Sequence, residues 1–443
     1  MKKLSIPDPL LLALGLTFLT LILALLFGTN PRPGFLGAAD VLTYWTKGFW
    51  GLLAFSMQMV LILLLGYMLA LSPVIDRFSS VLAGLSNKPI IGAVVVMIIA
   101  IIAGLINWGL ALVLGAVLVR KIGEQAKIKG NAINYALLGA AAYVCMMVWH
   151  GGLSGSAPLS VATAGHFLEA TTGIIPLSET VFSSMNITAS ALLLLLLPLA
   201  TWWFASKEKK IIPTGKSMHH LPDALTNYSN DPEIIINTLN NKTVWKPTII
   251  SISGLLLLTG FIASAIINPS CIGLNEVNLI LFALVLIAFP QVDKLSKATE
   301  TAIGSTAGII IQFPLYAGIM GIMNYSGLLE VMTSWFVEIS TQRSLPLLSF
   351  LSASIVNLFV PSGGGQWAVQ GPLFIDVANS IGVSHSKIVM AMAYGDQLSN
   401  MLQPFWALPL IGITGITAGQ IFRYSWRFMV IGTIIFVAVI WFF

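Results

Sequence analysis

The sequence predicts an all-α polytopic membrane protein, built from two inverted repeats that each contain a re-entrant hairpin and a broken helix. Composition is the first observation behind this prediction. The 443 residues are 57% hydrophobic and only 9% charged, whereas soluble domains carry about 25% charged residues. The second observation is a pair of similar interruptions in apolar sequence, Trp149–Pro158 and Tyr394–Pro404. Each holds a Leu-Ser pair among small and polar residues and ends in a proline.

The spanning segments follow from apolar stretches of about 20 residues. The first comes after Lys2 and Lys3 and is longer than the apolar core of a signal peptide, so we expect it to span the membrane. About nine full spans, broken helices included, and two hairpins are predicted. Full spans fall near 10–28, 47–71, 188–205, 247–268, 276–291, 302–324 and 425–443, divided segments at 88–122 and 345–382, and broken helices at 131–165 and 386–420.

The divided segments are predicted to be hairpins because small and polar residues interrupt each one. The first is interrupted at Ile106–Leu110 and the second at Val360–Trp367, where Pro361 and three glycines stop a helix. The helix that follows would present free N–H groups and a positive dipole end near the bilayer midplane. Close helix packing is the alternative reason for the glycines.

The distribution of basic residues predicts the orientation. If the N-terminus is cytoplasmic and both divided segments enter and leave on one side, 18 of the 22 Lys and Arg residues face the cytoplasm. The polar loop 206–246 is then cytoplasmic and the C-terminus lies outside. The remaining four, on the outer side, are Arg32, Lys47, Arg343 and Lys387. We expect a multi-pass protein of the bacterial cytoplasmic (inner) membrane, and no nucleic-acid partner, because the positive charge follows topology.

Polar residues also predict an internal repeat. Gln58 and Gln312 lie 254 residues apart, and Asn107–Gly109 and Pro361–Gly363 have the same offset. We therefore expect one integral membrane domain, 1–443, with repeat one at about 40–165 and repeat two at about 295–420. Because the first copy starts outside and the second inside, the repeats are inverted, as in many transporters. Paired breaks of this kind predict a substrate site.

Four of these segments resemble the short-chain fatty acid uptake transporters, the AtoE family: Ile106–Gly109, Trp149–Pro158, Val360–Pro372 and Ala393–Pro409. The likeness covers nearly the whole chain. It implies a secondary carrier of short-chain monocarboxylates such as acetoacetate or butyrate. The family is placed in the ion transporter superfamily, whose characterised members have inverted repeats with re-entrant hairpins, are commonly homodimers, and are thought to work by an elevator motion.

Three residues depart from the family pattern. His150 stands where the family has glycine, Gln366 where it has histidine and Asp396 where it has glutamate. The first two departures weaken any role for a histidine at either place, whereas the third preserves a carboxyl group.

A short-chain carboxylate has one charged end and a small apolar tail. No Lys or Arg falls at the centre of a predicted span, so hydroxyls, amides and helix N-termini must hold the charge. Each serine could instead bond its own helix backbone, and the tryptophans could pack or anchor rather than contact substrate. Candidate substrate-binding residues are Asn107, Trp108, Gly109, Ser154, Ser156, Ser362, Gly363, Gly364, Gly365, Gln366, Gln397 and Asn400.

Asp396 is the candidate coupling residue, because a carboxylate at bilayer depth is costly and usually functional. Burial favours its protonated form, so it could carry a proton with the substrate. A structural carboxylate bonded to the opposite hairpin is the alternative. His150 is a second candidate, since histidine titrates near neutral pH. Oxygen atoms near Asn107 and Asn400 would suit Na⁺, so the coupling ion is left open between H⁺ and Na⁺.

Other functional classes fit the sequence less well. A carrier of dicarboxylates or other small organic anions would need more cationic or donor groups. A channel would need a ring of like groups and an open path. An enzyme is not expected, because no nucleophile–base or metal-ligand set has an identifiable spacing. Cys145 and Cys271 imply neither a disulfide nor a metal framework.

Overall fold

A computed structural model describes residues 9–30, 32, 35–207, 247–267, 273–357 and 363–443. Within these residues the chain is almost entirely helical, and no strand is present. Six of the described helical segments are long and apolar enough to cross a membrane. The predicted class, an all-α polytopic membrane protein, is confirmed.

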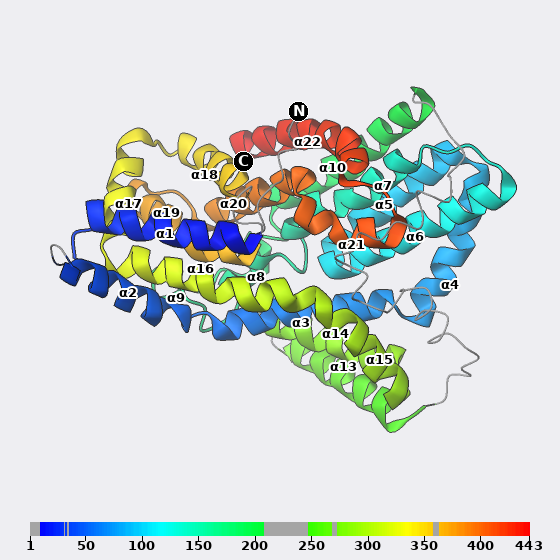
Figure 1. Ribbon diagram of the computed structural model, residues 1–443, viewed down its shortest axis with the longest axis horizontal. Coiled ribbons are helices and arrows are strands. Elements are labelled where there is room, and N and C mark those ends of the chain that lie inside the picture. The colour runs from blue at the N-terminus through cyan, green and yellow to red at the C-terminus, as the bar shows by residue number, and fades with distance from the viewer. Residues whose placement is uncertain (1–8, 31, 33–34, 208–246, 268–272, 358–362) are drawn as a thin grey trace.

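The first half of the chain contains the following helices (Figure 1): α1 (Pro9–Phe27), α2 (Phe35–Phe49), α3 (Leu53–Ala70), α4 (Pro73–Leu82), α5 (Pro89–Ile106), α6 (Trp108–Lys129), α7 (Tyr135–Tyr143), α8 (Ser156–Ala162), α9 (Glu169–Thr172) and α10 (Ser184–Lys207). The second half contains α13 (Ile249–Ile267), α14 (Leu274–Ala288), α15 (Val292–Ile303), α16 (Ala307–Tyr325), α17 (Leu328–Ile339), α18 (Ser344–Val356), α19 (Gly363–Ile381), α20 (His385–Ser399), α21 (Pro404–Thr414) and α22 (Ala418–Phe442). Short 3₁₀ turns join several of them. The predicted cytoplasmic loop 206–246 falls almost wholly outside the described residues.

The single turn α9 was not predicted, and neither were four longer helices: α2, α4, α15 and α17. Each of these four has 10 to 15 residues and includes charged or polar positions, so a 20-residue hydropathy window passes over it. The predicted span 47–71 is wrong at its start. The chain turns at Gly51, whose N–H donates to Gly48 O (2.7 Å), and the apolar helix α3 begins only at Leu53.

Both divided segments fold back on themselves. Helices α5 and α6 pack together from the break at Asn107, and their far ends are joined where Asn131 Nδ2 donates to Asn87 Oδ1 (3.1 Å). In the second segment, Gln342 Nε2 donates to Ile381 O (3.0 Å), which joins the start of α18 to the end of α19. The tip of this second hairpin, residues 358–362, lies outside the described residues and includes Pro361 and Ser362.

Both broken helices are also present. In the first, α7 ends at Tyr143, two 3₁₀ turns follow, and α8 starts at Ser156. In the second, α20 ends at Ser399, a 3₁₀ turn covers Asn400–Leu402, and α21 starts with Pro404, a residue that suits a helix start because it has no N–H to leave unpaired. The most apolar window of the first broken helix is 89% buried, against 11% for α13. This helix therefore lies in the interior and α13 at the periphery.

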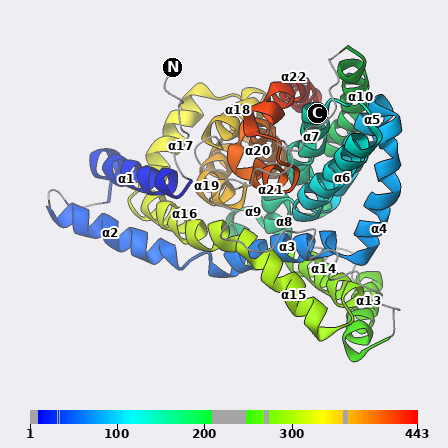
Figure 2. The same cartoon turned by 45° about the vertical axis from the view of Figure 1, so that its right-hand side comes forward.

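The broken helices occupy the middle of the molecule. Helix α20 packs between α18 and α22 and also touches α8 and α19. Helix α16 packs against α1 and α2. Helix α3 packs against α6 and α14. Figures 1 and 2 show the long pair α3 and α16 beneath the orange α20 and α21, with the α13–α14 pair projecting below.

Candidate functional site

The two broken helices meet at their unwound turns. The backbone N–H groups of His150 and Gly151 both donate to Gln397 Oε1, at 3.0 and 3.2 Å. The hydroxyl of Tyr143 lies within 2.8 Å of Asn400 O and 2.7 Å of Gln403 O. The two interruptions that resemble each other in sequence are therefore bonded to each other in the interior.

His150 and Asp396 form a buried pair at this meeting point. His150 Nδ1 lies 3.1 Å from Asp396 Oδ1, and the two side chains are 2% and 3% exposed. The N–H of Ala157 donates to His150 Nε2 (3.0 Å). A ring nitrogen that accepts a hydrogen bond carries no proton, so the proton of the neutral ring is on Nδ1 and is donated to Asp396. The second carboxylate oxygen, Oδ2, is buried and has no hydrogen-bond partner among the described residues.

The tip of the first hairpin, where Asn107 separates α5 from α6, is bonded to the first broken helix. The N–H of Trp108 donates to Ser154 Oγ (3.0 Å), and that of Leu153 donates to Leu105 O (2.7 Å). Asn107 is fully buried and caps α6, because its Oδ1 accepts the N–H of Leu110 (2.8 Å). The tip is thus fixed beside the site by a helix cap and a serine hydroxyl.

The second hairpin is bonded to the second broken helix through Asn357. Its Nδ2 lies within 2.9 Å of three oxygen atoms, Asp396 O, Ser399 Oγ and Asn400 Oδ1. Its own carbonyl accepts from Gln403 Nε2 (2.5 Å). These bonds hold the hairpin against the unwound turn.

The start of α19 packs against aromatic rings. A Cβ added to Gly363, Gly364 or Gly365 would lie 2.8, 2.9 or 2.3 Å from the nearest ring atom, so only glycine permits this approach. The nearest rings belong to Trp149, Phe55 and Tyr316, respectively. The triple glycine therefore brings a helix N-terminus to the first broken helix, α3 and α16.

Most of the predicted site residues come together here. His150, Ser154, Gly363, Asp396, Gln397 and Asn400 are linked by the bonds and contacts above. Trp108 joins them through its N–H, and Asn107 and Gly109 lie beside it against α3. Gly364 and Gly365 follow Gly363 in α19.

Two predicted residues, Ser156 and Gln366, are placed differently, and a third is not described. Ser156 Oγ donates to Met59 Sδ (3.3 Å). Gln366 is buried, and its Nε2 donates to Ala353 O and Gln370 Oε1, both at 2.8 Å, which ties it to its own hairpin. Ser362 lies outside the described residues.

The residues of the site that were missed from the sequence include Asn357 and Asn186. Asn186, near the start of α10, donates from Nδ2 to Gly151 O (2.7 Å) and accepts from the Tyr394 hydroxyl (3.1 Å). It thereby joins the two broken helices. The available signal was an amide side chain near polar residues at each position, beside Ser183 and Ser184 for Asn186 and three residues before the interruption at Val360–Trp367 for Asn357.

The electrostatics of the centre come from a carboxylate and dipoles. Two basic side chains of α6 are paired with carboxylates outside the centre, Arg120 with Glu124 and Lys121 with Asp76. Near the start of α2, the hydrogen bond from Arg32 lowers the pKa of Asp40 to about 2. Among the described residues, no group of three or more His, Cys, Asp and Glu side chains could hold a metal ion.

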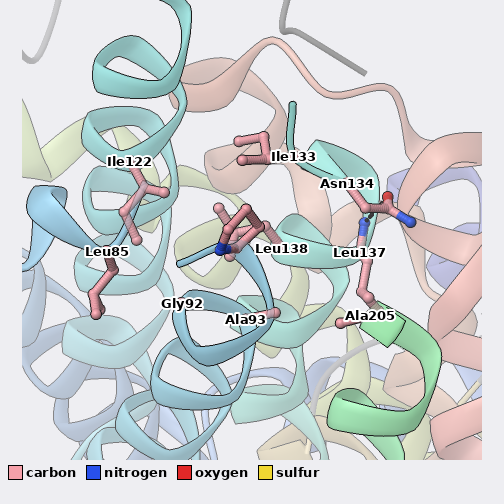
Figure 3. A pocket seen from close by; sticks show the side chains of 10 residues that line it. Leu85, Gly92, Ala93, Ile122, Ile133, Asn134, Leu137, Leu138 and Ala205 are labelled. Carbon is pink, nitrogen blue, oxygen red and sulfur yellow. Dashed lines mark hydrogen bonds between the residues drawn. The ribbon is translucent and has the colours of Figure 1, made fainter. Parts of the chain in front are cut away.

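A pocket lies elsewhere, among the ends of α5, α6, α7 and α10 (Figure 3). It is lined mostly by apolar side chains such as Leu85, Ile122 and Leu137, and it contains no predicted site residue. The pocket therefore lies apart from the polar centre that the two broken helices form.

Comparison with known proteins adds a family and a fold. A family profile described as short chain fatty acid transporter matches residues 1–443. A Haemophilus influenzae protein, provisionally named a short-chain fatty acid transporter, is 37% identical over 99% of this chain and 96% of its own length. An Escherichia coli protein with the same provisional name is 35% identical over 98% and 95%.

Two solved structures share the fold at low sequence identity. MtrF of Neisseria gonorrhoeae, described with a class of antimetabolite efflux pumps, has a TM-score of 0.53 at 14% identity and covers 99% of this chain and 95% of its own. The YdaH transporter of Alcanivorax borkumensis has a TM-score of 0.58 at 16% identity, covering 97% and 98%.

Proposed function

Because this chain belongs to the short-chain fatty acid transporter family, we propose that it is a secondary active transporter of short-chain monocarboxylates such as butyrate or acetoacetate. It is a transporter rather than an enzyme. The observation that carries the substrate class is the charge of the centre, where one carboxylate lies among uncharged donors. Such a site suits an anion with one charge better than a dicarboxylate.

We propose that the coupling ion is a proton and that Asp396 binds it, with His150 as its partner. The buried, unpartnered Oδ2 of Asp396 supports this role, because a proton there supplies a donor and removes a charge from a low-dielectric interior. A carboxylate substrate and a proton then cross together without net charge. Na⁺ is the second candidate, supported by two further buried acceptor oxygens, Asn357 Oδ1 and Gln366 Oε1, which have no partner in the part of the chain that the structure describes.

The proposal includes two inverted repeats and an elevator motion. It is supported by the order of helices, because α3, α4, α5 and α6 begin at 53, 73, 89 and 108, and α16, α17, α18 and α19 begin at 307, 328, 344 and 363. Each helix of the second set therefore begins 254 or 255 residues after the corresponding helix of the first set. The basic residues support opposite orientations. The hairpins would then be re-entrant, and the hairpins and broken helices would move together against the other helices.

Location and assembly complete the proposal. The protein would lie in the bacterial inner membrane, with the N-terminus in the cytoplasm and the C-terminus outside, as a homodimer. The charge bias supports the orientation.

Competition for labelled butyrate uptake into proteoliposomes tests the substrate class. Protein-free liposomes give the background, because the neutral acid crosses bilayers unaided. Uptake above background should saturate, and acetoacetate should compete for it whereas succinate should not. Equal competition by succinate would make the protein a dicarboxylate carrier, and flux that does not saturate would favour a channel.

A further inference from the structure

Beside the polar centre lies an aromatic cluster of four rings, those of Phe55, Phe167, Phe313 and Trp367. Phe55 lies 5.8 Å from Phe313 and 6.2 Å from Phe167, measured between ring centroids. Phe167 in turn lies 6.5 Å from Trp367. The rings come from α3, α16, α19 and the loop between α8 and α10, so segments far apart in the sequence meet at one apolar place.

The aromatic cluster adjoins the polar centre along the start of α19. A Cβ added to Gly363 would lie 2.9 Å from His150 Cε1, in the proposed proton site. A Cβ added to the next residue, Gly364, would lie 2.9 Å from the nearest atoms of Phe55 and 3.0 Å from Phe313 Cε1. Because neighbouring residues of one helix touch both, the polar centre and the aromatic cluster lie side by side.

Phe167 differs from the other three rings. It is only partly buried and lies in a turn, whereas the others belong to long helices and are at most 7% exposed. Polar contacts fix the backbone around it: the N–H of Leu168 donates to His166 Nδ1 (3.3 Å), and that of Leu274 donates to Thr163 Oγ1 (3.0 Å). Because loops are more mobile than the helices they connect, this ring is displaced more easily than the other three.

We propose that the aromatic cluster holds the apolar tail of the substrate and that Phe167 sets the longest tail that the site accepts. This inference rests on the proposed function, because it takes the carboxylate to lie at the polar centre. A tail that starts there passes Phe55 and Phe313 and then meets Phe167. Since the rings already touch one another, each further CH₂ group of a longer acid presses on the Phe167 ring, and such overpacking is unfavourable.

The Phe167→Ala variant tests this inference by opening the end of the aromatic cluster. Unlabelled butyrate or hexanoate competes with labelled butyrate in proteoliposomes preloaded with butyrate, so exchange is measured without an ion gradient that the acids could dissipate. In the variant, the inhibition constant of hexanoate should fall relative to that of butyrate by on the order of tenfold. Burial of the two additional CH₂ groups of hexanoate accounts for a change of this size, about 1.4 kcal/mol.

Two further variants complete the test. Phe167→Trp enlarges the ring and should shift the ratio of the two inhibition constants in the opposite direction, against hexanoate. Phe182→Ala is the matched control, because Phe182 also lies between α8 and α10 but its side chain is 52% exposed. It should keep the wild-type ratio.

A wild-type ratio in both Phe167→Ala and Phe167→Trp would overturn the inference, because a ring that only packs affects both acids alike. If Phe167→Ala does not fold, Phe167→Leu and Phe167→Trp decide the question by the same ratio. Either result leaves the proposed function intact as long as the wild-type protein exchanges butyrate. Failure of the wild-type protein to exchange butyrate would instead refute the proposed function.

Discussion

At Asp396, burial is combined with an incomplete set of hydrogen bonds: His150 satisfies Oδ1, whereas Oδ2 has no partner among the described residues. The Asp396→Asn variant keeps the shape of the side chain and removes its ability to take up and release a proton. Proton-driven butyrate uptake in proteoliposomes should fall to the passive level, whereas exchange of labelled for unlabelled butyrate should continue, because exchange need not unload the proton. Gradient-driven uptake at the wild-type level would exclude Asp396 as the coupling group.

Gly66 on α3 makes room for the cap of the first hairpin tip. A Cβ at this position would lie 2.0 Å from Asn107 Oδ1 and 2.9 Å from Leu110 N. Gly66→Ala should therefore lower stability by about 1–3 kcal/mol, the usual cost of overpacking, measured as thermal unfolding in detergent. Gly260→Ala is the control, because Gly260 in α13 has no neighbouring atom within 4 Å of an added Cβ. That substitution should leave stability unchanged or raise it by up to about 1 kcal/mol. Equal melting temperatures for the two variants would contradict this reading of the tip.

Sequence reasoning identified the chemical groups of the centre better than their partners. Asp396 and His150 were recognisable because each is an ionisable residue inside an apolar segment. Their pairing was not, because 246 residues separate them. Asn357 escaped notice since its three oxygen partners lie on another helix.

On the scale of the element, the start of α19 depends on close contact with aromatic rings. The nearest atoms to a Cβ at Gly364 would be Phe55 Cε1 at 2.9 Å and Phe313 Cε1 at 3.0 Å. Gly364→Val adds a branched side chain between two rings and should abolish butyrate transport in protein that still inserts into the membrane. Phe55→Leu should restore part of the activity, because it opens space on one side. Normal transport by Gly364→Val alone would show that α19 does not approach these rings.

Hydropathy predicted the apolar helices within a few residues at most ends, as at α1 and α10. It failed at α4 and α15, where Asp76 or Asp293 lies in the first turn and the helices have only 10 and 12 residues. Helices of this length gain their stability from packing one face against neighbours, which composition alone does not reveal. The hairpins were predictable because glycine, proline and asparagine interrupt otherwise apolar sequence.

On the scale of the whole molecule, the inverted repeat makes a prediction about accessibility. Single cysteines placed at Lys88 and Lys387, in protein with Cys145 and Cys271 replaced, should react with an impermeant thiol reagent from opposite faces of the membrane. Lys88 should label from the cytoplasm and Lys387 from outside, because the positive-inside distribution places them so. Labelling of both cysteines from the same face would contradict the inverted repeat and the elevator motion that depends on it.

Transport under separate ion gradients tests the central claim most directly. Initial rates of labelled butyrate uptake are measured in liposomes that contain wild-type protein, Asp396→Asn protein or no protein, under an inward proton gradient or an inward Na⁺ gradient. The neutral acid crosses the bilayer passively in all three preparations. The protein-dependent rate is therefore the rate with protein minus the rate in protein-free liposomes. We predict a saturable rate for the wild type under the proton gradient, none for Asp396→Asn, and no stimulation by Na⁺. Equal rates in all three preparations under both gradients would contradict a carrier of short-chain monocarboxylates, and stimulation by Na⁺ alone would contradict the proton as its coupling ion.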